Sequence, residues 1–379
     1  MVADSPALTR PSIRLAYLDG IRAIAASYVV IFHAVLGFGG ANLTGVGRIL
    51  RRASAFGHEA VAVFIVLSGY CLALPVLNQQ PLRLKLPLAS FARRRALRIL
   101  PPYFAALALS LLLMALIPAL RTPSTGTIWD ASLPGLRLGP IVSHALLIHN
   151  LSPEYALQIN GPLWSVATEW QIYFLYPSLL LPAWRRGGAL AVLASAALLG
   201  YLPLLIAPAA AASAGSWYVL LFALGMASAN VSFGSGSARK LQALPWRLIA
   251  SASWGLLAVV GLVFAGVWFG HKPVTDCLVG LAMAAVLVQL TSTATRREAP
   301  RGFLLGLLEA KPLLALGHFS YSLYLTHLPV VALCYFALRP LRLSPLPFSL
   351  LLVLTGFAAS LLVARAFYLA VERPSMLRR

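Results

Sequence analysis

The first apolar segment of the sequence contains three ionisable side chains, Asp19, Arg22 and His33. Ionisable groups inside a bilayer cost free energy and commonly mark a functional site. Because about three helical turns separate Arg22 from His33, the two share one helix face, roughly 16 Å apart along the axis. One long ligand could therefore place an anionic group at Arg22 and a reactive group at His33. In the structural alternative, Arg22 reaches lipid phosphates, His33 makes a core hydrogen bond, and Asp19 pairs with Arg22.

A basic cluster, FARRRALRILPPY, follows at 91–103. Arg95 and Arg98 are three residues apart and share a helix face. The rigid fork of a guanidinium suits phosphate, so this pair indicates a site for a phosphate-bearing ligand. The alternative is a basic loop that sets the membrane topology and binds anionic lipid.

A third group of polar residues, Trp164, Ser165, Glu169 and Tyr173, opens an apolar run. Ser165, Glu169 and Tyr173 recur at intervals of four and form one polar stripe on a helix. Glu169 lies roughly 9 Å inside the surface where this helix begins, at a depth comparable to that of His33. Two titratable groups at matched depth suit proton transfer during acyl or phosphoryl transfer. The alternative is a buried carboxylate with a structural partner.

The segment at 317–327 adds Tyr321 and His327. We expect His327 in the outer half of the membrane, where a structural hydrogen bond to a neighbouring helix is at least as plausible as a role in the site. The three cysteines lie in apolar stretches and suggest no disulfide or zinc framework. No set of Cys, His and Asp residues predicts a metal site.

The chain that must position these residues is very apolar. Of its 379 residues, 60% are hydrophobic and 11% charged, whereas about a quarter of a soluble domain is charged. This composition excludes a soluble enzyme and an ordinary nucleic-acid-binding protein. Runs of about 20 apolar residues predict spanning helices. Ten such runs lie at 17–40, 57–77, 98–120, 163–184, 188–208, 214–233, 247–269, 273–292, 312–336 and 346–371.

The basic residues predict the orientation of these spans. With both termini in the cytoplasm, 20 of the 30 Lys and Arg residues lie on the cytoplasmic side and 8 outside. If the short segment 139–152 also crossed, the counts would become 11 and 17. The bias of Lys and Arg toward the cytoplasm therefore favours ten spans. Segment 139–152 is then an outer-face or re-entrant element whose histidines are wet or buried in protein.

Two other classes of membrane protein remain as alternatives. A transporter or flippase of an anionic or sugar substrate would also bury Arg, Glu and His, but the sequence has no convincing internal repeat of the kind that many transporters show. A purely structural membrane protein would not explain so many titratable groups in the spans.

Six motifs in order along the chain resemble the membrane-bound acyltransferase family 3. The first is LDGIRAIAA at 18–26, followed by His33 with ten residues between the Arg and the His. The others are FIVLSGY at 64–70, RALR at 95–98, WSVATE at 164–169, SYSLYLTH at 320–327 and ERP at 372–374. One departure is Ala62, where many members have Asp, with Gly57, His58 and Glu59 before it.

The resemblance implies an integral enzyme of the bacterial inner membrane. Such an enzyme moves an acyl group, usually acetyl, from cytoplasmic acyl-CoA to a hydroxyl of a carbohydrate, glycolipid or other acceptor. We expect one membrane-embedded domain over 1–379 without an appended soluble esterase-like domain, and no nucleic-acid partner. A cell-surface carbohydrate or glycolipid is the expected acceptor because that is the commonest role in the family.

The spacing and the resemblance lead to one mechanistic hypothesis. Arg95, Arg98 and Arg22 bind the phosphates of acyl-CoA. The pantetheine arm follows the first helix, so that the thioester reaches His33. His33 acts as general base or as a transient acyl carrier, and Glu169 orients His33 or the acceptor or stabilises an imidazolium. The residues expected to bind substrate or support the site are Asp19, Trp164, Ser165, Tyr173, Tyr321 and His327. No metal is expected.

Overall fold

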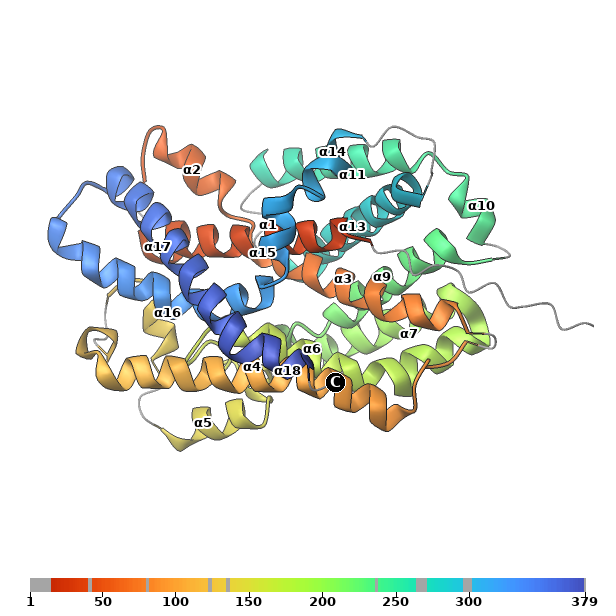
Figure 1. The fold of residues 1–379 in the computed structure, drawn as a ribbon, viewed down its shortest axis with the longest axis horizontal. Helices are drawn as coiled ribbons and strands as arrows, with labels where there is room; N and C mark the ends of the chain where they lie inside the picture. The colour runs from red at the N-terminus through yellow and green to blue at the C-terminus, as the bar shows by residue number, and fades with distance from the viewer. Residues whose placement is uncertain are drawn as a thin grey trace, which may run out of the picture.

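The computed structural model describes residues 15–39, 43–79, 82–121, 125–133, 137–235, 238–263, 271–295 and 302–377. Within these residues the ordered elements are helices and helical turns, with no strand. The predicted all-α class is therefore confirmed, and Figure 1 shows the helices gathered into one bundle.

The longer helices are α1 (Tyr17–Phe32), α3 (Gly57–Leu77), α4 (Leu88–Leu116), α6 (Leu163–Leu175), α7 (Leu181–Ile206), α9 (Tyr218–Phe233), α11 (Trp246–Val263), α13 (Lys272–Thr295), α16 (Ser320–Leu338) and α17 (Pro345–Phe367). The shorter ones are α2 (Gly47–Ala53), α5 (Leu138–Ala145), α8 (Pro208–Ala214), α10 (Ala238–Gln242), α14 (Phe303–Leu308), α15 (Lys311–Gly317) and α18 (Arg373–Leu377). Helical turns at His33–Gly39, Tyr176–Leu180 and Tyr368–Glu372 are of the π type, and those at Pro118–Arg121, Ile128–Ser132, His149–Leu151 and Arg339–Leu341 are 3-10 turns.

Seven helical stretches among the described residues are long and apolar enough to span a membrane, or eight if the bent pair α8 and α9 forms one span. The stretch Leu163–Ile206 covers two of the ten predicted spans, 163–184 and 188–208, and its backbone leaves helical geometry at Gly187 and Gly188. Another predicted span, 247–269, falls on the shorter apolar helix α11, and residues 264–270 lie outside the described residues. The chain is thus a multi-pass membrane protein. Helix length and composition alone assign seven or eight spans to the part of the chain that the structure describes.

The segment 139–152 forms α5 and a 3-10 turn and is too short to span a bilayer. Its histidines, His144 and His149, are fully buried with their rings stacked 3.7 Å apart between centroids. Burial lowers the pKa of both imidazoles below the usual value, so both are neutral at pH 7. As predicted, these side chains face protein rather than lipid.

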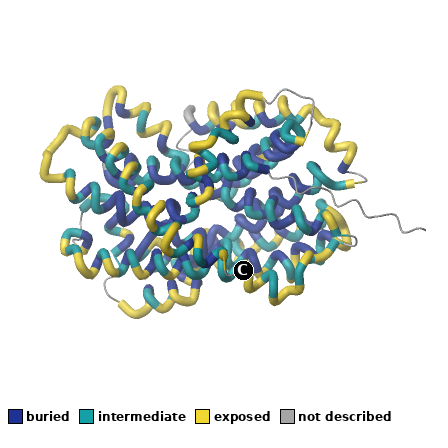
Figure 2. The backbone as a smooth tube through the Cα atoms, in the orientation of Figure 1, coloured by how far each residue is buried: buried dark blue, intermediate teal, exposed yellow. Residues whose placement is uncertain are grey.

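The ends of α1 and α3 determine where the site lies. The two helices pack side by side in antiparallel directions, so His33 at the end of α1 lies at the same end of the bundle as Gly57 at the start of α3 (Figure 1). Helix α2 connects them at that end. It is exposed over most of its length, whereas α3 runs through the buried centre of the bundle (Figure 2).

Helices α3 and α9 cross at two glycines without side chains between their backbones. A Cβ on Gly69 would lie 1.9 Å from the backbone oxygen of Phe222, and one on Gly225 would lie 2.0 Å from that of Val66. Such close approach is a common way for membrane helices to pack. This contact fixes the position of α3, whose residues His58 and Val61 line the cavity described below.

Gly69→Ala should therefore destabilise the protein, because the methyl group would push α3 and α9 apart. We expect a loss of at least about 1–3 kcal/mol, the range for overpacked cores, measured as a lowered melting temperature in detergent. Gly255 on α11 has open space around its Cβ position, so Gly255→Ala is the matched control and should be neutral or slightly stabilising. Equal melting temperatures for Gly69→Ala and Gly255→Ala would contradict this packing.

Candidate active site

The imidazole of His33 is held by two hydrogen bonds at the end of α1. Its Nδ1 lies 2.9 Å from the backbone oxygen of Val29 and 3.1 Å from Nε2 of His327 on α16. The ring centroids of the two histidines are 4.9 Å apart. His33 also begins the π-helical turn His33–Gly39, and such turns are frequent at functional sites. Helices α1 and α16 thus fix one imidazole against the other.

The partners of His327 determine which nitrogen of His33 carries the proton. Nδ1 of His327 lies 2.8 Å from the backbone oxygen of Tyr324 and 3.2 Å from that of Leu323. Because carbonyl oxygens only accept hydrogen bonds, Nδ1 of His327 is the protonated nitrogen of a neutral ring and its Nε2 is an acceptor. Nδ1 of His33 is therefore the donor. Nε2 of His33 keeps its lone pair, and no other described residue hydrogen bonds to it.

His33 lines a cavity of about 500 Å³ at this end of the bundle. Trp164 and Tyr324 line the same cavity, together with His58 at the start of α3. The indole of Trp164 stacks on the imidazole of His58, with 5.6 Å between centroids and 12° between planes. The cavity therefore presents two imidazoles and several aromatic rings to a ligand.

The turn Ile128–Ser132 covers part of this cavity through Ile128 and Ser132. Asp130 organises the turn by accepting hydrogen bonds from the hydroxyl and backbone N–H of Thr125 and from the backbone N–H of Gly126. Burial opposes ionisation of Asp130, but these donors outweigh it and hold the pKa of the carboxyl below its usual value. The charged carboxylate thus fixes the loop at neutral pH.

A second, smaller cavity of about 80 Å³ contains most of the predicted polar residues. Its lining includes Arg22, Arg98, Ser165, Glu169, Tyr173 and Tyr321. Arg22 is paired with Asp19 at 2.8 Å and donates to the sulfur of Cys71. Tyr173 donates a 2.6 Å hydrogen bond to the carboxylate of Glu169. Two guanidiniums and one carboxylate therefore meet in a space too small for more than a narrow part of a ligand.

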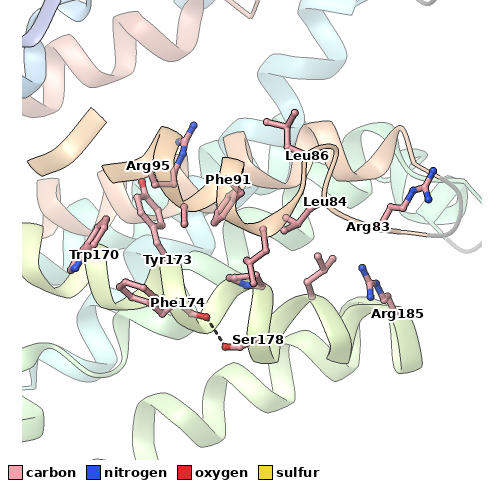
Figure 3. Close-up of a pocket in the computed structure, with 14 residues that line it drawn as sticks. Arg83, Leu84, Leu86, Phe91, Arg95, Trp170, Tyr173, Phe174, Ser178 and Arg185 are labelled. Carbon is pink, nitrogen blue, oxygen red and sulfur yellow. Dashed lines mark hydrogen bonds between the residues drawn. The ribbon is translucent and has the colours of Figure 1, made fainter. Parts of the chain in front are cut away.

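Arg95 lies in a third cavity, of about 670 Å³, between the start of α4 and the helices α6 and α7. Arg83 and Arg185 lie at one end of it, and Arg95 lies toward Trp170 and Tyr173 (Figure 3). The guanidinium of Arg95 is 5.9 Å from the centre of the Tyr173 ring. Its Nε is buried and has no hydrogen-bond partner among the described residues. An unpaired buried donor favours an anionic ligand here.

The three cavities are neighbours in a row. Tyr173 lines both the cavity of Arg95 and the small cavity of Arg22 and Glu169. Tyr324 and Val61 line both the small cavity and the cavity of His33. The arginines of α4 and His33 therefore line cavities that share walls.

Several contacts brace these walls. Ser165 and Tyr324 are hydrogen bonded through their hydroxyls at 2.7 Å, which ties α6 to α16. The buried Glu372 accepts hydrogen bonds from the backbone N–H and the hydroxyl of Ser322, so the ERP motif anchors α16. Tyr321 donates to the backbone oxygen of Ile99 at 3.3 Å and not to His327.

The structure thus brings most of the predicted residues together, with two differences. Arg95 and Arg98 line different cavities although they share a helix face. Glu169 forms no hydrogen bond with His33 among the described residues, and the group that orients His33 is His327.

A second histidine site was missed in the sequence. Nε2 of His58 lies 3.0 Å from Oδ2 of Asp276, which also accepts a 2.8 Å hydrogen bond from the indole of Trp217. Asp276 is fully buried in α13. The signal was available, because Asp276 is an ionisable residue inside the predicted span 273–292 and such residues default to functional candidates.

Comparison with known proteins gives one match. The family model of acyltransferase 3, described as an acyltransferase domain, matches residues 15–365. No curated protein and no solved structure matches the chain significantly. The family match covers nearly the whole chain and all the residues of the three cavities. We conclude that this multi-pass membrane protein belongs to the acyltransferase 3 family and is an acyltransferase.

Proposed function

We propose that this acyltransferase moves an acyl group, acetyl by preference, from acyl-CoA to an acceptor hydroxyl, with His33 as the catalytic base. The observation that carries the proposal is the hydrogen bonding of Nδ1 of the cavity-lining His33 to the carbonyl of Val29 and to His327, from which we infer that Nε2 keeps its lone pair. In the proposed setting, a bacterial inner membrane with both termini in the cytoplasm, acyl-CoA arrives from the cytoplasmic side. Residues 1–379 act as one membrane-embedded domain.

The row of cavities supports acyl-CoA as the donor. Its nucleotide end carries phosphates, and the widest of the three cavities offers Arg83, Arg95 and Arg185. Guanidiniums bind phosphates through charge-assisted hydrogen bonds. The narrow cavity with Arg22 and Arg98 admits an extended arm, and the thioester then reaches His33 at the far end.

The chemical step uses one nitrogen. Nε2 of His33 takes the proton of the acceptor hydroxyl as its oxygen attacks the thioester carbon. The carbon–sulfur bond breaks, and Nε2 returns the proton to the departing thiolate of CoA. The same lone pair serves an acyl-imidazole intermediate, and both routes need Nδ1 of His33 to carry its proton.

His327 acts as a positioning residue in this step. The hydrogen bond from Nδ1 of His33 to Nε2 of His327 strengthens as positive charge develops on His33. Glu169 is hydrogen bonded to Tyr173 and lines the same small cavity as Arg22 and Arg98. In the proposed mechanism it positions the arm of acyl-CoA and does not contact His33.

A transporter is the rival function, since a row of cavities would also suit a permeating solute. The two functions differ in thiol chemistry. An acyltransferase releases free CoA when donor and acceptor are present, and a transporter does not.

His33→Ala should abolish transfer while leaving donor binding intact. We expect CoA release from acetyl-CoA and a cell-envelope extract to fall to background, because removing a general base or nucleophile costs at least about a hundredfold. Membranes with wild type and variant are compared by thiol assay, and acetyl-CoA binding is measured on purified protein. CoA release by His33→Ala at the wild-type rate would contradict the mechanism.

Arg98→Lys should weaken acetyl-CoA binding, because an ammonium does not reproduce the guanidinium fork. The affinity should fall by about tenfold or more in purified protein with an unchanged melting temperature. Arg94→Lys is the matched control, since Arg94 is exposed and outside the three cavities. Equal affinity for the Arg98→Lys variant and the control would exclude Arg98 from the donor site.

His327→Leu should lower kcat without changing the affinity for acetyl-CoA, because His33 loses the imidazole that stabilises its developing positive charge and keeps only the carbonyl of Val29 at Nδ1. A reduction of about ten- to a hundredfold is expected for a supporting hydrogen bond of this kind. His327→Gln places an amide oxygen near the position of Nε2 and should restore part of the rate. A purely structural role predicts equal losses for both variants, in step with their melting temperatures.

A further inference from the structure

A strongly basic cavity of about 660 Å³ lies beside the cavity of His33, and the site described above does not use it. Arg48, Arg51 and Arg52 of α2 and Lys272 of α13 line it. All four side chains belong to exposed residues. The cavity also contains the buried carboxylate of Glu59, so basic groups outnumber acidic ones four to one.

The position of these arginines is unusual for a membrane protein. In the predicted topology, α2 lies on the outer side, where Lys and Arg are scarce in short loops. The structure also holds α2 in place, because the hydroxyl of Tyr28 on α1 donates to the backbone oxygen of Ala53. Topology therefore gives no reason for the cluster, and its fixed placement favours the binding of an anion.

An apolar groove of about 520 Å³ begins where the basic cavity ends. The two share Phe56 and Glu59. Apart from Tyr28 and Glu59, the groove is lined by aliphatic and aromatic side chains and alanines of α1, α3, α11, α13 and neighbouring segments. Ile24 and Trp254 on its walls remain 44% and 39% exposed, so the groove is open at the side of the bundle. A hydrocarbon chain matches this lining.

The basic cavity also adjoins the proposed reaction centre. Phe32, His58 and Lys272 line both it and the cavity of His33. Nε2 of His58 is hydrogen bonded to the buried carboxylate of Asp276, which leaves Nδ1 as the ring nitrogen without a hydrogen-bond partner among the described residues. The apolar groove therefore shares lining residues with the basic cavity, and the basic cavity shares lining residues with the cavity of His33.

We propose that the acyl acceptor is an anionic lipid with a phosphate in its headgroup. Its tail lies in the groove between α1, α3, α11 and α13, and its phosphate binds Arg48, Arg51, Arg52 and Lys272. Its headgroup hydroxyl reaches the cavity of His33 and His58. This inference rests on the proposed acyl transfer and names its acceptor class. A soluble phosphate ester would bind the arginines but would leave the apolar groove empty. A lipid occupies both the basic cavity and the groove, so it matches the structure better.

The test measures lipid binding to the full-length protein in nanodiscs of phosphatidylcholine. Fluorescent dioleoyl phosphatidic acid is the probe, and unlabelled phosphatidic acid, phosphatidylcholine and glycerol phosphate are the competitors. Phosphatidic acid should compete at least about tenfold better than either of the others, since glycerol phosphate has no tails and phosphatidylcholine has no net negative charge. Equal competition by glycerol phosphate would show that the tails do not contribute to binding, and equal competition by phosphatidylcholine would show that the site does not select an anionic headgroup; either result would overturn the proposal.

Two variants and one control locate the binding. The triple variant Arg48→Gln, Arg51→Gln, Arg52→Gln should bind phosphatidic acid at least about tenfold more weakly, as expected for three partly exposed charge pairs. Arg239→Gln, Lys240→Gln, Arg247→Gln removes the same charge from exposed positions elsewhere on the protein and should bind like wild type. Ala258→Trp fills the groove from an exposed position and should weaken phosphatidic acid binding with the arginines intact.

The outcomes separate this inference from the proposed function. Equal binding by the two triple variants, or no loss on filling the groove, would overturn the lipid acceptor even where His33-dependent CoA release is observed. Selective binding that both the α2 and the groove variants weaken would support the lipid site. If CoA release then proved independent of His33, the proposed chemistry would fail while the lipid site remained.

Discussion

The hydrogen bond between His33 and His327 is the contact on which the proposed chemistry depends. Two neutral imidazoles can share one proton in two ways, and the surrounding backbone allows one of them. The carbonyls of Leu323 and Tyr324 occupy Nδ1 of His327, and the carbonyl of Val29 lies at Nδ1 of His33. The lone pair of His33 is thereby directed to Nε2. Ser322 and Glu372 hold α16, and the close crossing of α3 and α9 holds the opposite wall.

Fixing a tautomer with backbone oxygens has an energetic reason in this setting. A carboxylate next to His33 would have to be buried at considerable cost. The carbonyl groups of Val29 on α1 and of Leu323 and Tyr324 on α16 provide acceptors without a net charge. The charged groups proposed to contact the donor lie in the other cavities, with Arg22 paired to Asp19 and Glu169 hydrogen bonded to Tyr173. The protein can therefore separate the binding of a polyanionic donor from the nitrogen that moves the proton.

The sequence predicted much of this arrangement because helical periodicity is regular. Arg22 and His33 share a face of α1, and Ser165, Glu169 and Tyr173 form a stripe on α6, as a period of 3.6 residues requires. The pairing of residues from distant helices was not predictable. Nothing in one sequence places His327 against His33, or Asp276 against His58, since these contacts depend on how helices pack. Arg95 and Arg98 line different cavities, and Tyr173 forms part of the wall of both. Helix length alone does not give the number of spans between 163 and 206. One apolar helical stretch covers these residues, and its backbone leaves helical geometry at Gly187 and Gly188.

The tautomer of His33 is the central claim, and it can be measured without knowing the acceptor. Protein labelled with ¹⁵N-histidine is compared with the His33→Gln variant by NMR in detergent at neutral pH, and the difference isolates the two ring nitrogens of His33. The account predicts a protonated Nδ1 and an unprotonated Nε2. A protonated Nε2 in the wild-type protein would contradict the account, since the nitrogen assigned to the acceptor hydroxyl would then have no lone pair to offer.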